Sequence, residues 1–319
     1  MILSEMARKL RIQFPGAIYH VLNRGNYKSD IFADQGAAHA FVKTLEEAVE
    51  RFGWRLGAYV VMRNHYHLTF QTPEPNLSAG MHWLQCTFAT RFNRLRNERG
   101  HLFQGRYKAI LLETNTDWAR VADYIHLNPV RAGIVAPDQL TQFRWSSLTR
   151  YSKSQRFNGL SSLGWLQIHG LQDVEQDWLR YADILLQKHT NSSTDTNDER
   201  VALTSGWAIG STIWKEQTLQ GALAEMKDSP RSEGLHLPRE MLQIKWRLRL
   251  EEELKELSKS AEELMADRKS AGWKVALAER LQRETGASTI WLAESLHMGQ
   301  PSSVRAYLWK YRKNHVNTT

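Results

Sequence analysis

The sequence predicts an α+β fold for the first half of this 319-residue chain and a helical region for the second half. Up to about residue 130, apolar runs rich in β-branched residues alternate with amphipathic helical runs. The runs at 56–62 and 65–71 are joined by only Arg63 and Asn64, a connection short enough to predict an antiparallel hairpin. Helices that alternate with an antiparallel sheet give an α+β sandwich.

The predicted elements of the first half follow one another as strand, helix, strand, strand, helix, strand and helix. Their ranges are 17–22, 35–52, 56–62, 65–71, 77–97, 107–113 and 115–129. In the last helix we expect Thr116 as N-cap, Asp117 at the positive end of the dipole and Pro129 as the stop. The helix at 77–97 carries Cys86, the only cysteine of the sequence, so an internal disulfide is excluded. Its place in this helical run favours a buried, inert thiol over a nucleophile.

The triplet His65-Tyr66-His67 begins the strand at 65–71. Because side chains alternate along a strand, both imidazoles share one face, about 7 Å apart, and Tyr66 points to the other. We therefore expect an apolar face packed inward and a chelating pair of imidazoles that faces a cleft. Two solvated surface histidines are the alternative interpretation.

The helix at 115–129 holds a tyrosine away from its apolar stripe. At 100° per residue, Tyr124 lies about 110° from the centre of the stripe formed by Trp118, Val121, Ala122 and Ile125. Asn128 follows four residues later and shares its face. This pair would offer a phenol and an amide oxygen to one site.

These segments resemble a known family. His65-Tyr66-His67 is similar to the His-hydrophobic-His motif of the HUH nucleases, and residues 123–133 are similar to the tyrosine helix of the single-tyrosine (Y1) transposases. The nearest resemblance is to the REP-associated tyrosine transposases, relatives of the IS200/IS605 transposases. Residues 19–25, 60–64 and 100–107 support it, and together the resemblance covers about residues 10–150. Arg63 departs from the pattern, because proline is usual there.

The resemblance implies a ferredoxin-like, RRM-like antiparallel sheet with helices, the HUH nuclease fold, and histidines on a central strand. It also implies a metal-dependent endonuclease and strand transferase for single-stranded or hairpin DNA with REP or BIME palindromes. His65 and His67 would hold Mg or Mn with Asn128 as third ligand, and Tyr124 would be the nucleophile that forms a 5′-phosphotyrosine. Tyr107, in a β-like run before Lys108, is the rival nucleophile, although a role in packing or DNA contact is favoured for it. Two imidazoles alone would also suit Zn. A non-catalytic DNA-binding regulator is the alternative, and a zinc hydrolase is disfavoured because no nearby Glu offers a general base.

Charge points to a polyanionic partner. The net charge is +8, and residues 1–150 hold 19 Lys and Arg against 12 Asp and Glu. We expect DNA-phosphate contacts from basic residues of this part, with solvated surface as the alternative: Arg24, Arg91, Arg94, Arg106 and Lys108. The sequence shows neither a membrane-length apolar run nor a signal peptide, so we expect a cytoplasmic, nucleoid-associated monomer or homodimer.

Three regions are predicted: a catalytic domain at 1–150, a helical connector with a polar linker at 151–200, and a helical C-terminal domain at 201–319. Within the last, 288–311 has the pattern of a helix-turn-helix, with an ordinary helical hairpin as the alternative. Its candidate groove-facing residues are Ser302, Ser303, Arg305 and Tyr307. Since every catalytic candidate precedes residue 130, deleting the tail from about residue 201 is expected to impair DNA binding more than cleavage.

Overall fold

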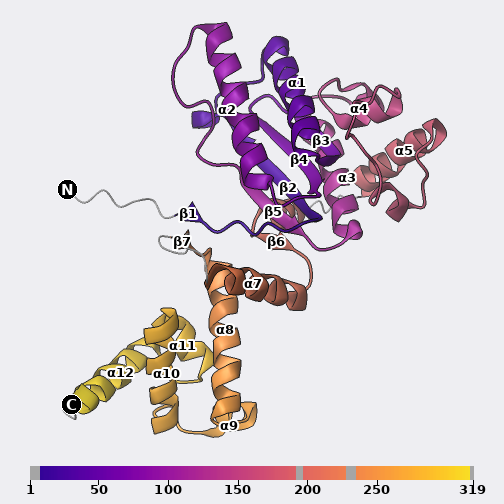
Figure 1. Cartoon of the computed structure of the whole chain (residues 1–319). Coiled ribbons are helices and arrows are strands. Elements are labelled where there is room, and N and C mark those ends of the chain that lie inside the picture. Colours follow the sequence, from indigo (N-terminus) through magenta and orange to yellow (C-terminus); the bar gives the residue numbers. More distant parts are fainter. Residues whose placement is uncertain (1–7, 192–196, 228–234, 317–319) are drawn as a thin grey trace. The chain divides into compact units, whose positions relative to one another are not determined.

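The computed structural model describes residues 8–191, 197–227 and 235–316 (Figure 1). The chain divides into two compact units. One spans Arg11–Trp214, and the other runs from Lys215 onward and includes the short strand β1 (Arg8–Lys9). The first unit is α+β and the second is largely helical, which confirms the predicted fold class. The first unit ends 64 residues later than the predicted boundary at 150, at Trp214.

The first unit is built on a five-stranded sheet with the order β3-β4-β2-β5-β6. The strands are β2 (Ala17–Arg24), β3 (Arg55–Val61), β4 (His65–Thr72), β5 (Lys108–Leu112) and β6 (Ala208–Ile209). The pairs within β3-β4-β2-β5 are antiparallel, and the predicted hairpin is β3-β4. The short β6 pairs in parallel with β5, so the sheet is mixed rather than wholly antiparallel. Its residues come from a segment that the sequence assigned to another domain.

Helices cover both faces of this sheet (Figure 1). The helices α1 (Gln35–Phe52) and α2 (Leu77–Arg96) lie on the face that carries Tyr66 and Phe70. There the Phe41 ring lies 4.6 Å from that of Tyr66. Cys86 is exposed, contrary to the prediction of a buried thiol. It lies two residues, or about 200° of helical rotation, from the buried Leu84, and so on the opposite side of α2.

Helix α3 (Asn115–Arg131) covers the opposite face of the sheet. Its N-cap is Thr114 rather than Thr116, because Thr114 and Asp117 form a reciprocal capping box. Pro129 does not end the helix, which continues to Arg131. A proline has no backbone N–H, so it removes one hydrogen bond of the helix. The helix tolerates this loss in its last turn because its buried apolar stripe already holds it on the sheet.

The segment after α3 belongs to the same unit. It contains η2 (Pro137–Gln142), α4 (Ser147–Ser152), η3 (Leu166–His169), α5 (Glu175–Asn191) and α6 (Asn197–Thr204). The Tyr151 and Trp178 rings stack 4.2 Å apart, and Trp165 and Tyr181 are buried beside them. This aromatic cluster explains why 151–191 packs as part of the first unit instead of acting as a connector. Residues 192–196 of the predicted linker lie outside the described residues.

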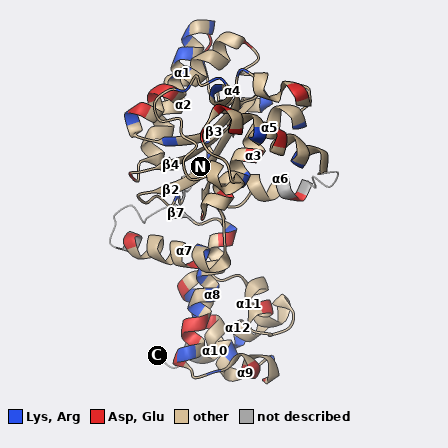
Figure 2. Ribbon diagram, turned by 90° about the vertical axis from the view of Figure 1, so that its right-hand side faces the viewer, with Lys and Arg blue, Asp and Glu red and all other residues tan. Residues whose placement is uncertain are grey.

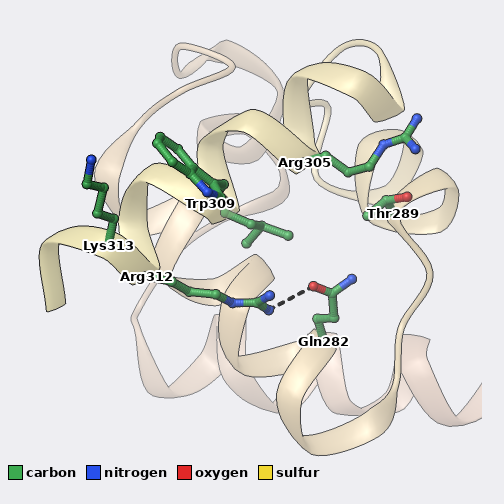
Figure 3. A pocket seen from close by; sticks show the side chains of 7 residues that line it. Gln282, Thr289, Arg305, Trp309, Arg312 and Lys313 are labelled. Carbon is green, nitrogen blue, oxygen red and sulfur yellow. Dashed lines mark hydrogen bonds between the residues drawn. The ribbon is translucent and has the colours of Figure 1, made fainter. Parts of the chain in front are cut away.

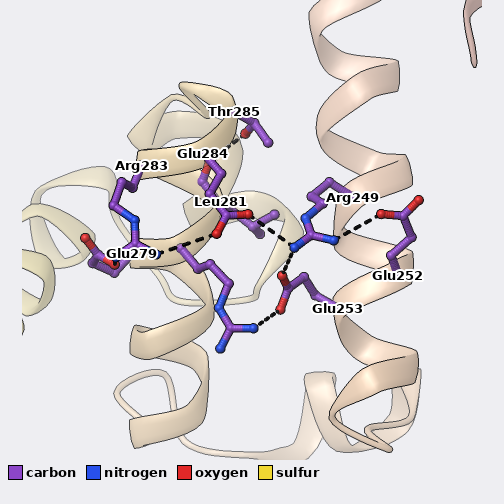
Figure 4. A network of polar contacts seen from close by, with 9 residues as sticks. Arg249, Glu252, Glu253, Glu279, Leu281, Arg283, Glu284 and Thr285 are labelled. Carbon is purple, nitrogen blue, oxygen red and sulfur yellow. Dashed lines mark hydrogen bonds and ion pairs between the residues drawn. The ribbon is translucent and has the colours of Figure 1, made fainter. Parts of the chain in front are cut away.

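The described part of the second unit contains β7 (Leu235–His236), which pairs in parallel with β1, and five helices. These are α8 (Arg239–Glu256), α9 (Ala261–Ala266), α10 (Gly272–Thr285), α11 (Thr289–Ser295) and α12 (Pro301–Val316), while α7 (Thr212–Lys227) spans the boundary between the units. Glu253 is fully buried, and both Arg249 and Arg280 lie 2.6 Å from its carboxylate oxygens (Figure 4). Two guanidinium groups therefore compensate a carboxylate that would be costly to bury alone.

Both signs of charge are interspersed on the helices (Figure 2). Among the described residues, no helix is long and apolar enough to cross a membrane.

Candidate active site around His65, His67 and Tyr124

The two predicted imidazoles lie on β4, an interior strand of the sheet. Their ring centroids are 5.2 Å apart and the rings are nearly perpendicular. His65 is half-buried, whereas His67 is only 3% exposed. The sequence predicted that both would face a cleft. The structure buries His67 because helix α3 packs over this face of the sheet.

A third histidine, His20 on β2, contacts His67 directly. His20 Nε2 lies 2.9 Å from His67 Nδ1, and His20 Nδ1 lies 2.8 Å from the carbonyl oxygen of Leu203. A carbonyl only accepts, so His20 Nδ1 carries a hydrogen and donates it to Leu203. In the neutral ring, His20 Nε2 must then accept from His67 Nδ1. His67 Nε2 is thereby left with a free lone pair.

The His65 tautomer is fixed by a second hydrogen-bond chain. Its Nδ1 lies 2.7 Å from Asn64 Oδ1. The orientation of the Asn64 amide follows from its Nδ2, which donates to the carbonyl of Lys28 at 3.2 Å. His65 Nδ1 therefore donates to Asn64, and His65 Nε2 carries a free lone pair. Both histidines of the motif present the same nitrogen, Nε2, as a potential ligand.

Burial keeps these imidazoles neutral. It lowers the pKa of His20 to about 4, despite its hydrogen bond to Leu203. Burial, followed by repulsion from His20 and His65, lowers the pKa of His67 well below its usual value. Burial and the charge of Arg24 lower the pKa of His65. At neutral pH the site therefore offers lone pairs rather than positive charge.

Tyr124 lies on α3 beside the histidines. Its ring centroid is 5.5 Å from that of His67 and 6.1 Å from that of His20, in edge-to-face geometry. The side chain is only 6% exposed, so Tyr124 is more buried than its position off the apolar stripe predicted. The guanidinium carbon of Arg131 lies 5.5 Å from the tyrosine ring centroid. The structure thus brings together the predicted nucleophile and the predicted metal-binding pair.

Asn128, the predicted third ligand, is half-buried one turn after Tyr124. Its Nδ2 donates to the backbone carbonyl of Tyr124 at 2.9 Å, which leaves its Oδ1 as the unused atom of the amide. Within the described residues, no three His, Cys, Asp or Glu side chains are arranged to hold a metal ion. His20 is close, but both of its nitrogens are used in hydrogen bonds. The lone pairs of His65 and His67 fit a cation that accepts imidazole nitrogen.

The rival tyrosine, Tyr107, lies outside this arrangement. It is 6% exposed, and the guanidinium of Arg11 stacks 3.8 Å above its ring. The Arg11 guanidinium also donates to the carbonyl oxygen of Tyr107. Burial raises the pKa of its phenol. These contacts fit the packing role that the sequence favoured.

The predicted DNA-contact residues differ in how far they are engaged within the protein. Arg91 forms a two-pronged ion pair with Glu47, and Lys108 donates to the carbonyl of Thr204 at 2.6 Å. Arg24 is exposed and donates to Gln104. Arg94 and Arg106 are also exposed. In the second unit Arg305 is exposed on α12, whereas Tyr307 is half-buried and packs partly against the core.

Sequence reasoning missed two features of this region. The first is His20, whose only signal was a histidine within an otherwise apolar strand. The second is a buried polar network next to Tyr124. Tyr181 donates to Asp123 at 2.8 Å, and His126 contacts both Tyr181 (3.0 Å) and Ser147 (2.7 Å). The network joins α3 to α4 and α5, and no sequence pattern pairs residues so distant.

Asp123 anchors this network on α3. Its carboxylate lies 3.0 Å from His169 Nε2 and 2.5 Å from Lys188 Nζ. Burial alone would raise the pKa of Asp123, but His169 and Lys188 outweigh burial and lower it. The carboxylate is therefore ionised. Its contacts with His169 in η3 and Lys188 in α5 hold α3 at the residue that precedes Tyr124.

Comparisons with known proteins bear on the first unit. Residues 13–128 match the sequence model of the family described as "Transposase IS200 like". One solved structure, of a REP-associated tyrosine transposase bound to a REP hairpin, aligns with 50% of this chain and 88% of its own, with 22% identity and a TM-score of 0.37. A structure described as a candidate transposase from Deinococcus radiodurans R1 aligns with 37% of this chain and 95% of its own, with 22% identity and a TM-score of 0.28. A search of curated proteins finds no significant match.

The family match includes β2, with His20, and the whole His65-Tyr66-His67 strand, and it ends at Asn128 in the tyrosine helix. Through residues 13–128, this chain is similar to the family described as "Transposase IS200 like".

Proposed function

We propose that this protein is a metal-dependent endonuclease and strand transferase that cleaves single-stranded DNA beside a hairpin, with Tyr124 as nucleophile. The observation that carries the proposal is the contact between the Tyr124 ring and His67, which has a free Nε2 lone pair. The match of residues 13–128 to the IS200-like transposase family model supports the same reaction class. Hairpins of the REP type are the proposed substrate.

In this proposal the phenol oxygen of Tyr124 attacks the scissile phosphorus. The bond from phosphorus to the 3′ oxygen breaks, the phenolic proton is lost, and the departing oxygen takes up a proton. The products are a 5′-phosphotyrosine and a free 3′-OH, and the phosphotyrosine keeps the phosphoester available for rejoining. A divalent cation such as Mg or Mn, once bound, would neutralise charge on the phosphate. His65 Nε2 and His67 Nε2, with Asn128 Oδ1 as the third donor, are the residues that would hold it.

We also propose that α12 of the second unit contacts DNA. Between Pro301 and Val316 it has four basic residues and no acidic one: Arg305, Lys310, Arg312 and Lys313. It borders a groove of about 510 Å³ that also includes Trp309, 66% exposed, and Gln282, which pairs with Arg312 (Figure 3). A short helix (α11), a turn and a basic helix (α12) follow one another in the order of a helix-turn-helix.

The experiment that tests the catalytic proposal looks for a covalent adduct. The full chain is incubated with hairpin DNA, labelled at either end, in Mg or Mn, and then denatured. A 5′-phosphotyrosine predicts that the 3′-end label stays with the protein while the 5′-labelled fragment is released. Tyr124→Phe should abolish the adduct and retain DNA affinity, whereas Tyr107→Phe, the matched control, should form it.

His65→Ala and His67→Ala should each remove metal-dependent cleavage, because the single imidazole that remains provides too few ligands to hold the cation. An adduct that persists in Tyr124→Phe would move the nucleophile elsewhere. Wild-type protein that binds the hairpin but forms no adduct would favour the alternative, a non-catalytic DNA-binding regulator.

A further inference from the structure

A tight loop after β2 displays one aromatic side chain to solvent. Tyr27, in the short helix η1 (Asn26–Lys28), is 92% exposed, more than any other large hydrophobic residue described. Its backbone has φ 51°, and the next residue, Lys28, has φ 59°. Two consecutive non-glycine residues in the left-handed region are unusual, because each carries a steric cost between Cβ and the backbone.

The rest of the loop maintains this conformation. The amide of Gly25 donates to the carbonyl of Asn64 at 2.8 Å, and the amide of Asn26 donates to the carbonyl of Leu102 at 2.9 Å. A Cβ on Gly25 would lie 2.3 Å from the carbonyl oxygen of Ser29, so only glycine fits there. A single exposed aromatic is ordinary on a protein surface. An exposed aromatic on a strained loop, fixed from both sides, is a stronger indication of function.

The same loop is joined to the active site through one side chain. Asn64 Nδ2 donates to the carbonyl of Lys28, and Asn64 Oδ1 accepts from His65 Nδ1. The loop is also continuous with Arg24, which lies opposite His65 in the pairing of β2 with β4. Asn64 thus links the residue that follows Tyr27 to His65, one of the two proposed metal ligands.

The surface beside the loop is suited to a nucleic-acid strand. A groove of about 280 Å³ is lined by Ser29, which directly follows the loop, and by the exposed Arg99 and His101. Its two acidic lining residues are both paired, Asp30 with Arg63 at 2.7 Å and Glu98 with Arg96 at 3.0 Å. A phosphate can lie against the exposed Arg99 while a nearby aromatic ring stacks on a base.

We infer that Tyr27 is a stacking platform for an unpaired base of the DNA strand that enters the active site. This inference rests on the proposed function, because it assigns the substrate strand of the same site. Every nucleobase has a face that can stack, so Tyr27 would hold the strand near the histidines without reading a hydrogen-bond pattern. Tyr27 would be a binding residue that takes no part in the chemistry.

The test uses the full chain and a hairpin with a single-stranded extension that carries 2-aminopurine at one unpaired position after another. Wild-type protein should quench the fluorescence most strongly at one position. Tyr27→Ala should abolish that quenching and weaken binding about tenfold, the effect expected for removing one stacked base. Tyr27→Phe should behave like wild type. Leu95→Ala, which removes another exposed apolar side chain of this unit, is the matched control and should change neither readout.

The outcomes separate the two proposals. If Tyr27→Ala binds with wild-type affinity and the same quenching pattern, the stacking inference is overturned, even when Tyr124 forms its adduct. The inference would also be overturned if Tyr27→Ala and Leu95→Ala lost equal binding affinity and equal quenching. The same holds if wild-type protein bound a blunt duplex as tightly as the extended hairpin and quenched no position of the extension. If wild-type protein binds the extension but forms no adduct, the catalytic proposal fails and the stacking inference is decided by the affinities.

Discussion

His20 Nε2 accepts a hydrogen bond from His67 Nδ1 at 2.9 Å, and the carbonyl of Leu203 fixes that direction from the far side of His20. His20 is therefore a positioning residue, since it holds the His67 ring with Nε2 unprotonated and available. Partners of this kind orient metal ligands in many proteins and set their basicity.

Replacing His20 with Phe should weaken Mn²⁺ binding about 10- to 100-fold, because His67 then loses the acceptor that fixes its tautomer. Titration of the full chain with Mn²⁺, followed by electron paramagnetic resonance, measures this without catalysis. Thr69→Val is a matched control, because Thr69 is buried opposite His20 and its hydroxyl has no hydrogen-bond partner among the described residues. Unchanged Mn²⁺ affinity in His20→Phe would show that the contact is only structural packing.

Two truncations that differ by 14 residues should behave differently. A chain that ends at residue 200 lacks the Leu203 carbonyl and β6, so it should lose cleavage of a short oligonucleotide. A chain that ends at 214 keeps the first unit and should cleave, but bind DNA more weakly. This replaces the sequence-based expectation that deletion from 201 would spare chemistry. Equal cleavage by both chains would show that residues 201–214 are dispensable.

Substitutions in α12 should weaken DNA binding while cleavage of a short oligonucleotide continues. Arg305→Ala and Lys313→Ala each remove one phosphate-binding charge, so the slope of the salt dependence should fall by about one unit for each phosphate that is no longer neutralised. Binding measured at several salt concentrations gives that slope. Glu251→Ala, on the neighbouring α8, removes an exposed charge of the opposite sign and serves as the control. An unchanged slope in both α12 variants would remove this helix from the DNA interface.

Acid should destabilise the first unit through His126. Burial lowers its pKa to about 3 in the folded protein, whereas the unfolded chain has the ordinary value near 6.5. Between these values the unfolded state binds the extra proton, so the free energy of unfolding falls as pH drops, by at most about 1.4 kcal/mol per pH unit. Urea unfolding at several pH values measures this free energy, which should depend less steeply on pH in His126→Gln than in the wild type. Identical slopes would mean that His126 titrates alike in both states.

The thiol of Cys86 should react in the native protein. Because Cys86 is exposed on α2, a maleimide should label the folded chain at one site without denaturant, and Cys86→Ser should remove the label. The substitution should change the free energy of unfolding by less than about 0.5 kcal/mol, as is usual at exposed positions. Labelling that requires urea would restore the original prediction of a buried thiol.

The sequence predicted the local elements of the first unit well, because each depends on periodicity over a few residues. The helix expected at 35–52 begins and ends at those residues, and the hairpin of β3 and β4 has the expected short turn. The pairing of His65 with His67 likewise follows from strand alternation. Tyr124 was placed by its spacing on α3, and its burial against His67 needed the packing of that helix on the sheet.

The features that escaped prediction depend on contacts between distant residues. His20 and Leu203 are separated by 183 positions, and His126 and Tyr181 by 55. Residues 151–191 lack a conspicuous pattern, yet Tyr151, Trp165 and Trp178 form one cluster in the structure. Periodicity reports which face of an element is apolar, and not which other element covers it.

The contact of His20 with Leu203 also sets an order of events during synthesis. The strands that carry all three histidines leave the ribosome within the first quarter of the chain, but the carbonyl that directs their hydrogen bonds follows more than a hundred residues later. Contacts between such distant residues form late and slowly. A nascent chain therefore carries the histidine motif long before its imidazoles are set in one tautomer, so a ribosome-bound fragment would hold the motif in an unfinished site.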